Sequence, residues 1–212
     1  MAMAAVETGY APQEEVAEEE RARADVYALL AALFYSPPSE GLLKSIAAAR
    51  LVNEDANDTQ LARSWAALQA AARTAVPEAV RHEYDNAFIT AGRPPVFLYG
   101  SVYQAGFLMD KPLAQLRDDL ARLGLARRRE VGEPEDHISG LCDVMRFLIV
   151  GADSVPPAPV DAQREFFERH LAPWYTRLCD AIEVAEPTHF YRRVAAFARA
   201  FFDLELRSFE IA

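Results

Sequence analysis

The chain has 212 residues, of which 51% are hydrophobic and 25% charged, and its formal net charge at pH 7 is −10. This composition is typical of a globular protein and excludes a disordered chain. The acidic balance argues against nucleic acid and against anionic membrane surfaces, since both favour basic patches. No apolar run is long enough for a membrane span, and no signal peptide is visible, so we expect a cytoplasmic protein.

The N-terminal region divides into an acidic stretch and two helices. Residues 1–20 are predicted to form an acidic, flexible tail, because so many carboxylates cannot be buried. From residue 21 the apolar side chains follow helical spacing, and Pro37 and Pro38 end that helix. Ser39 is a good N-cap residue, so a second helix is expected to begin directly after it.

Two further helices and an unusual loop follow. A third helix is expected to begin at Asp58 or Thr59, and a fourth at Pro77, where the missing N–H costs nothing. The fourth helix is predicted to end near Thr90. The segment 91–103 contains two glycines, two prolines and three aromatic residues, so it is predicted to be an irregular loop with an apolar surface.

The second half of the chain has the same helical character. Lys111 and Pro112 open a fifth helix, and Pro134 fits the first turn of a sixth, with Glu135 and Asp136 beside it. Residues 151–159 are rich in proline and form a candidate hinge, after which three more helices follow, the last beginning at Pro187. No run alternates with period two, so residues 21–212 are predicted to form one all-α domain, a bundle of eight or nine helices.

Common catalytic and metal-binding motifs are absent from the sequence. His82 and Glu83 would begin an HExxH zinc motif, but Asn86 stands where the second histidine is needed. The four histidines show no ligand spacing with one another or with Cys142 and Cys179, which we interpret as buried, reduced thiols. Neither a metal ion nor a cofactor is expected.

Asp136 and His137 are the one place in the sequence where a carboxylate residue directly precedes a histidine. Catalysis would need Asp136 to orient His137 while the other ring nitrogen meets a substrate proton. Neighbouring residues of a helix point about 100° apart, so this arrangement is awkward. A purely local role is the plainer alternative, in which Asp136 charges a helix start and His137 bonds nearby. Binding of a ligand is the third interpretation.

The residues around this pair favour binding. Glu133, Glu135 and Asp136 lie within four residues, and carboxylates accept guanidinium groups in bidentate fashion. If the loop 91–103 folds beside them, the result is an apolar groove with an acidic end. Such a groove would suit a peptide that carries arginines followed by hydrophobic residues.

At these residues the sequence resembles the redox-enzyme maturation chaperones of the TorD/DmsD type, and more distantly the NarJ type. The resemblance rests on several pieces in the same order, over roughly residues 20 to 207. These are Tyr27–Phe34, Glu83-Tyr84-Asp85 with Phe88, Tyr99-Gly100-Ser101-Val102-Tyr103, Glu133-Pro134-Glu135-Asp136-His137, His170–Trp174 and Phe190-Tyr191.

The resemblance implies an all-helical, TorD-like fold and no enzyme activity. It implies a cytoplasmic chaperone that binds the twin-arginine signal peptide of a molybdenum-cofactor oxidoreductase subunit, and often the apo body of that subunit, until the cofactor is inserted. It also implies a monomer or a domain-swapped dimer. The expected peptide-binding residues are Phe88, Gly92, Tyr99, Ser101, Val102, Tyr103, Glu133, Pro134, Glu135, Asp136 and His137. The alternative is a small helical hydrolase or nucleotide-using enzyme with its site at Asp136 and His137.

Overall fold

Helices make up the regular structure of the described residues, which in this computed structural model are 17–49, 59–90, 92–127, 132–152, 155–186 and 188–211. These residues form ten α-helices and one π-helical segment and no strand, so the predicted all-α class is confirmed. The elements are α1 (Glu18–Tyr35), α2 (Glu40–Ala48), α3 (Gln60–Thr74), α4 (Pro77–Tyr84) with its π-helical continuation η2 (Asp85–Ile89), α5 (Gly100–Ala105), α6 (Lys111–Arg122), α7 (Ile138–Val150), α8 (Val160–His170), α9 (Tyr175–Val184) and α10 (Phe190–Ile211).

Several helices begin where local sequence signals predict. The Ser39 hydroxyl accepts the Leu42 N–H at 3.2 Å and so caps α2. Thr59 caps α3 in the same way, and Pro77 is the first residue of α4. In contrast, α1 already begins at Glu18, so the last three residues of the predicted tail are helical; residues 1–16 lie outside the described part.

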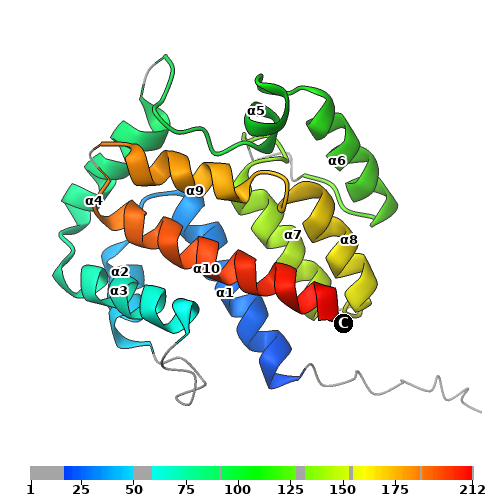
Figure 1. Cartoon of the computed structure of the whole chain (residues 1–212), viewed down its shortest axis with the longest axis horizontal. Helices are drawn as coiled ribbons and strands as arrows, with labels where there is room; N and C mark the ends of the chain where they lie inside the picture. The colour runs from blue at the N-terminus through cyan, green and yellow to red at the C-terminus, as the bar shows by residue number, and fades with distance from the viewer. Residues whose placement is uncertain are drawn as a thin grey trace, which may run out of the picture.

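The long helix α10 crosses the molecule and is the element around which most others pack (Figure 1). It lies against α3 and α9, while α1 packs mainly against α7 and also touches α10. Aromatic side chains fill these contacts: the rings of Trp65 and Phe197 lie 5.0 Å apart, and those of Tyr27 and Phe201 lie 4.9 Å apart. Burial of such side chains supplies most of the stabilisation.

A buried polar cluster ties α1 to α10. The Arg23 guanidinium donates to both carboxylate oxygens of Glu205, at 2.9 and 2.8 Å, and the Tyr27 hydroxyl donates to the same carboxylate at 3.0 Å. Glu205 is almost fully buried. A buried carboxylate needs such partners, because its desolvation is otherwise costly.

Two sequence-based boundaries are wrong. Residues 100–103 were expected to belong to an irregular loop, yet they form most of α5. This unpredicted helix brings the number of α-helices in the described residues to ten, where eight or nine were expected. The helix predicted to begin at Pro134 instead begins at Ile138, with His137 as its N-cap residue. The first error goes with the position of the Asp136 side chain, and the second with the cap that His137 provides, both described below. Helix α10 begins at Phe190, and Pro187 lies outside the described residues.

The α7–α8 connection, predicted as a hinge, is compact at its described residues. Gly151 has φ +69°, and the Ala158 N–H donates to the Leu148 carbonyl at 2.7 Å. Its use as a hinge stays a prediction. Over the described ranges, the helices are all too short or too polar to cross a membrane.

Candidate functional site

The loop before α5 and the segment before α7 meet in a short antiparallel contact. Tyr99 and His137 form an isolated β-bridge. The Gly100 N–H donates to the Asp136 carbonyl and the Ile138 N–H donates to the Leu98 carbonyl, both at 2.9 Å. The two segments that the sequence singled out are therefore adjacent, although more than thirty residues separate them in the chain.

Asp136 is turned inward and caps α5. Its Oδ2 accepts the Ser101 N–H at 2.8 Å, and only 3% of the residue is exposed. A carboxylate at this position stabilises the positive end of the helix and satisfies a backbone donor. This cap explains why Gly100 and Ser101 become helical. Its Oδ1 is buried without a hydrogen-bond partner among the described residues.

His137 serves its own helix. Its Nδ1 accepts the Ser139 N–H at 3.2 Å and lies 2.7 Å from the Ser139 hydroxyl, so the imidazole caps α7. Burial lowers the pKa of His137 to about 4, although the charges of Glu133 and Asp136 act in the opposite direction. At neutral pH the ring is therefore uncharged, and the proton is on Nε2 because Nδ1 is an acceptor.

Asp136 and His137 do not form a catalytic dyad. The carboxylate faces the N-terminus of α5, whereas the imidazole nitrogen that it would have to orient faces Ser139. The geometry matches the local interpretation of the pair with one change. Asp136 caps α5, which lies 35 residues earlier in the chain, and not the helix that follows it.

The other two carboxylates of the segment also have partners. The Tyr99 hydroxyl donates to Glu133, and burial together with this bond raises the pKa of Tyr99. Glu135 accepts Arg117 Nε and Nη2 at 3.0 and 2.8 Å, and Arg127 Nε lies 3.5 Å from it. Partial burial opposes the shift, but the bond from Arg117 lowers the pKa of Glu135. Unlike Asp136, Glu135 is only partly covered, and its arginine partners are exposed.

The predicted aromatic and glycine positions do not all belong to this contact. Tyr103, on α5, stacks on Trp174 with a centroid distance of 5.5 Å. Phe88 is buried in the core, with its ring 5.1 Å from those of Tyr84 and Tyr191. Gly92 is exposed, with φ +97°. The residues brought together are Tyr99, Ser101, Glu133, Pro134, Asp136 and His137, with half-buried Val102 on the same short helix.

Sequence reasoning missed the loop that joins α5 to α6. Phe107, Leu108 and Met109 are large, apolar and exposed, and the Met109 N–H donates to the Ser101 hydroxyl at 3.2 Å. The signal was available as three consecutive large apolar residues between Gly106 and Asp110, in a stretch for which no structure was predicted.

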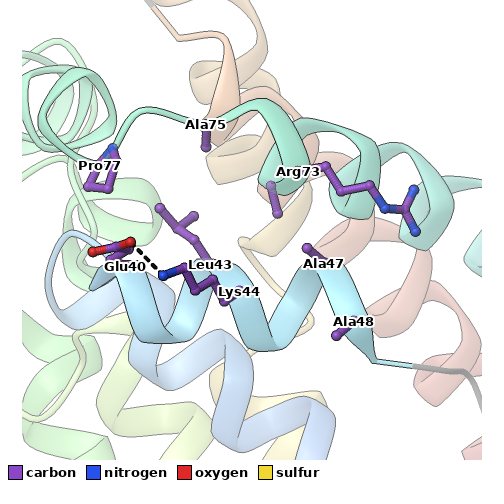
Figure 2. A pocket seen from close by; sticks show the side chains of 9 residues that line it. Glu40, Leu43, Lys44, Ala47, Ala48, Arg73, Ala75 and Pro77 are labelled. Atoms are coloured by element: carbon purple, nitrogen blue, oxygen red, sulfur yellow. Dashed lines mark ion pairs between the residues drawn. The ribbon is translucent and has the colours of Figure 1, made fainter.

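The pockets lie elsewhere. One of about 370 Å³ is formed by α2, the end of α3 and Pro77, and its lining includes four alanines and the Glu40–Lys44 ion pair (Figure 2). A second, of about 150 Å³, lies between α6 and α8. None of the candidate residues lines either pocket. Over the described ranges, no group of three or more His, Cys, Asp or Glu side chains is arranged to hold a metal ion.

Taken together, the geometry defines an all-helical protein with a two-segment polar contact and no catalytic dyad at Asp136 and His137. Residues 54–180 match the model of the family described as nitrate reductase delta subunit, which is more than half of the chain. The chain belongs to this family, as the resemblance predicted.

Named relatives point the same way. The chain is 26% identical to the chaperone protein TorD of Vibrio cholerae and 27% identical to that of Photobacterium profundum, each over 125 residues. These matches cover 56% of this chain, and 57% and 58% of the two relatives, which is less than two thirds of either. TorD proteins are chaperones, a non-enzymatic class, which agrees with the expectation that this chain is not an enzyme.

A solved structure supports the fold. A protein from Archaeoglobus fulgidus, whose name assigns it to redox enzyme maturation, superposes with a TM-score of 0.52 over 92% of this chain and 97% of its own. The sequence identity is 22%, so this likeness concerns the fold alone.

Proposed function

We propose that this protein is a cytoplasmic chaperone that binds the twin-arginine signal peptide of a molybdenum-cofactor oxidoreductase subunit and keeps the subunit from export until the cofactor is inserted. The observation that carries the proposal is the Tyr99–His137 contact, which joins the segment 91–103 to the acidic residues 133–136. Membership of a family that includes named chaperones supports it.

The contact suits a peptide better than a small molecule. The candidate residues line neither pocket, and a small-molecule site is normally a concave cavity. Tyr99 and Val102 are only half-buried, so they leave apolar surface for an extended segment. The partner is then the leader and the apo body of the client subunit, and the chaperone is a monomer or a domain-swapped dimer.

Glu135 is the carboxylate that best fits a client arginine. Asp136 is buried under α5 and Glu133 accepts the Tyr99 hydroxyl, whereas the ion pairs of Glu135 involve exposed arginines. Exposed ion pairs contribute little to stability, so a guanidinium from the leader can replace Arg117 at small cost. Arginine also binds a carboxylate in bidentate fashion, which lysine cannot do.

The test is a titration with the twin-arginine leaders of molybdenum-cofactor oxidoreductases encoded near this chain in the genome, each beside a twin-lysine version. We expect the lysine version to bind about tenfold more weakly, and Glu135→Gln to remove most of that difference. Glu183→Gln, an exposed carboxylate on α9, is the matched control and should change nothing.

Two outcomes would count against the proposal. Equal affinity for both peptides would remove the arginine-selective role of Glu135. Failure of every leader encoded nearby to bind would overturn the chaperone function itself. The alternative function, a small helical enzyme, requires a catalytic turnover that disappears in His137→Ala. The imidazole instead caps α7, which gives no support for a catalytic role.

A further inference from the structure

The loop between α5 and α6 exposes three consecutive large apolar side chains, which we call the apolar loop. The exposed fractions of Phe107, Leu108 and Met109 are 73%, 46% and 68%. The other exposed large apolar residues in the described part of the chain are isolated from one another in sequence. Contiguous apolar surface of this kind usually marks an interaction site.

The apolar loop is held in a defined and strained conformation. Gly106 ends α5 with φ +87°, and its N–H donates to the Val102 carbonyl at 2.9 Å. Met109 has φ +59°, and among the described residues it is the only one besides glycine with a positive φ. A side chain in this region costs roughly 1 kcal/mol or more, and such strain concentrates at functional sites.

A chain of two hydrogen bonds connects the apolar loop to Asp136. The Met109 N–H donates to the Ser101 hydroxyl at 3.2 Å, and the Ser101 N–H donates to Asp136 Oδ2 at 2.8 Å. Ser101 is fully buried and Asp136 is 3% exposed. Asp136 therefore acts on the loop through α5, and its bonded oxygen faces the protein rather than solvent.

We propose that the apolar loop binds the hydrophobic segment of the client leader, and that Asp136 is a positioning residue which holds the loop in place through Ser101. This inference rests on the proposed function and assigns the surface that takes the part of the leader beyond its arginines. Met109 suits such a role, because a flexible thioether adapts to varied apolar sequences.

The spacing between Glu135 and the apolar loop suits a twin-arginine leader, in which the arginines and the hydrophobic residues are close in sequence. Glu135 is held by Arg117, on the helix that begins at Lys111 directly after the loop. Six residues of helix rise about 9 Å, a span that three extended peptide residues cover. Because Arg117 contacts Glu135, we infer that one leader can reach both Glu135 and the apolar loop.

The size of the surface argues against a second copy of this chain as the occupant. A stable protein–protein interface buries about 800 Å² on each partner, with some 20–30 residues a side. Three side chains fall far short of that, whereas they are enough for a short apolar stretch of peptide.

The first experiment removes the apolar surface. The fluorescein-labelled leader named above is titrated into the full chain and into the double variant Phe107→Ser with Met109→Ser. We expect the double variant to bind at least tenfold more weakly. The matched control is Val184→Ser with Ile211→Ser, which removes two equally exposed apolar side chains elsewhere and should leave the affinity within twofold. Urea midpoints verify that both variants are folded.

The second experiment separates positioning from direct contact at Asp136. Asp136→Asn keeps an oxygen that can accept the Ser101 N–H but removes the charge, whereas Asp136→Ala removes both. Positioning predicts that the Asn variant retains most of the affinity, that the Ala variant loses it, and that Ala has no further effect when Phe107 and Met109 are already serine.

The outcomes distinguish the two proposals. Leader binding by the wild type with no loss in the Phe107/Met109 double variant overturns this inference and leaves the chaperone function standing. Equal losses in Asp136→Asn and Asp136→Ala overturn the positioning role. A wild-type dimer that this double variant dissociates, with peptide affinity unchanged, would make the loop a self-association surface. Absence of any leader binding by the wild type overturns the function and this inference together.

Discussion

At the scale of single residues, the important side chains act mainly on backbone groups. Asp136 accepts an N–H of α5, His137 accepts an N–H of α7, and Glu83 accepts the Phe190 and Tyr191 N–H groups at 3.1 and 2.6 Å at the start of α10. Each bond satisfies a helix terminus that would otherwise leave donors unpaired. Polar residues that look functional in the sequence can thus have an architectural role as well.

The burial of His137 makes stability depend on pH. Its pKa is about 4 in the folded protein and 6.5 as the ordinary value, so the unfolded chain binds a proton more readily between these limits. The contribution of His137 to the free energy of unfolding is therefore fully present above about pH 6.5, and it is lost as the pH drops towards 4. We expect roughly 2 kcal/mol to be lost from this residue by pH 5.

Urea unfolding of wild type and His137→Asn between pH 7 and pH 5 measures this effect. Asparagine can cap α7 but does not titrate, so the variant should lose less stability than wild type over that range. His82→Asn removes an exposed histidine and should follow the wild type. Parallel curves for His137→Asn and wild type would contradict the assignment.

At the scale of elements, the distance between a helix and its cap decides what the sequence could predict. Ser39 and Thr59 lie within three residues of the amides that they cap, so α2 and α3 were placed correctly. The cap of α5 comes from Asp136, 35 residues from Ser101, so that helix was taken for a loop. A pattern within one segment contains no information about a partner so far away.

The candidate site shows the same limit. Amphipathic spacing correctly predicted helices around it, but not which predicted residues face one another. Phe88 was expected at the peptide site and instead packs on Tyr84 and Tyr191, because helical spacing alone cannot tell a core aromatic from a binding one. The three apolar residues of the apolar loop could be read from the sequence, but their exposure is a property of the folded chain and could not.

The packing of α5 depends on a residue without a side chain. A Cβ atom on Gly100 would lie 2.9 Å from Trp174 Nε1 and 3.0 Å from its Cε2. Trp174 cannot move away easily, because it is fully buried and its Nε1 donates to the His170 carbonyl at 2.6 Å. We expect Gly100→Ala to destabilise the protein by about 1–3 kcal/mol, despite the better helix propensity of alanine.

The measurement is the urea midpoint of Gly100→Ala, together with amide hydrogen exchange across α5. Gly41→Ala in α2 is the matched control, since its Cβ would meet the nearest atom at an ordinary 3.7 Å. That variant should be neutral or slightly more stable. An unchanged urea midpoint in Gly100→Ala would mean that the Trp174 side chain can shift to make room for the added methyl group.

At the scale of the whole molecule, the Glu205 cluster joins elements from opposite ends of the described chain. Glu205→Ala leaves Arg23 and Tyr27 without their shared acceptor. Removing one partner of a buried pair costs about 3–5 kcal/mol, and because the Arg23 side chain keeps 22% of its surface exposed we expect about 2–3 kcal/mol. Urea denaturation is the measurement.

Glu210→Ala, an exposed residue of the same helix, tests whether any loss of a carboxylate in α10 has this effect. It should stay within about 0.5 kcal/mol of wild type. If Glu205→Ala did so too, the cluster would not contribute to stability.

The same cluster has a consequence for how the protein is made. Glu205 follows Arg23 by 182 residues and Tyr27 by 178, so a ribosome synthesises α1 long before the helix that completes its environment. The nascent chain can already pack α1 on α7. Arg23 and Tyr27, however, have no Glu205 carboxylate to donate to until α10 has emerged from the ribosome. Folding of this helical domain is thus expected to finish only once α10 has left the ribosome, and until then the growing chain itself needs protection from aggregation.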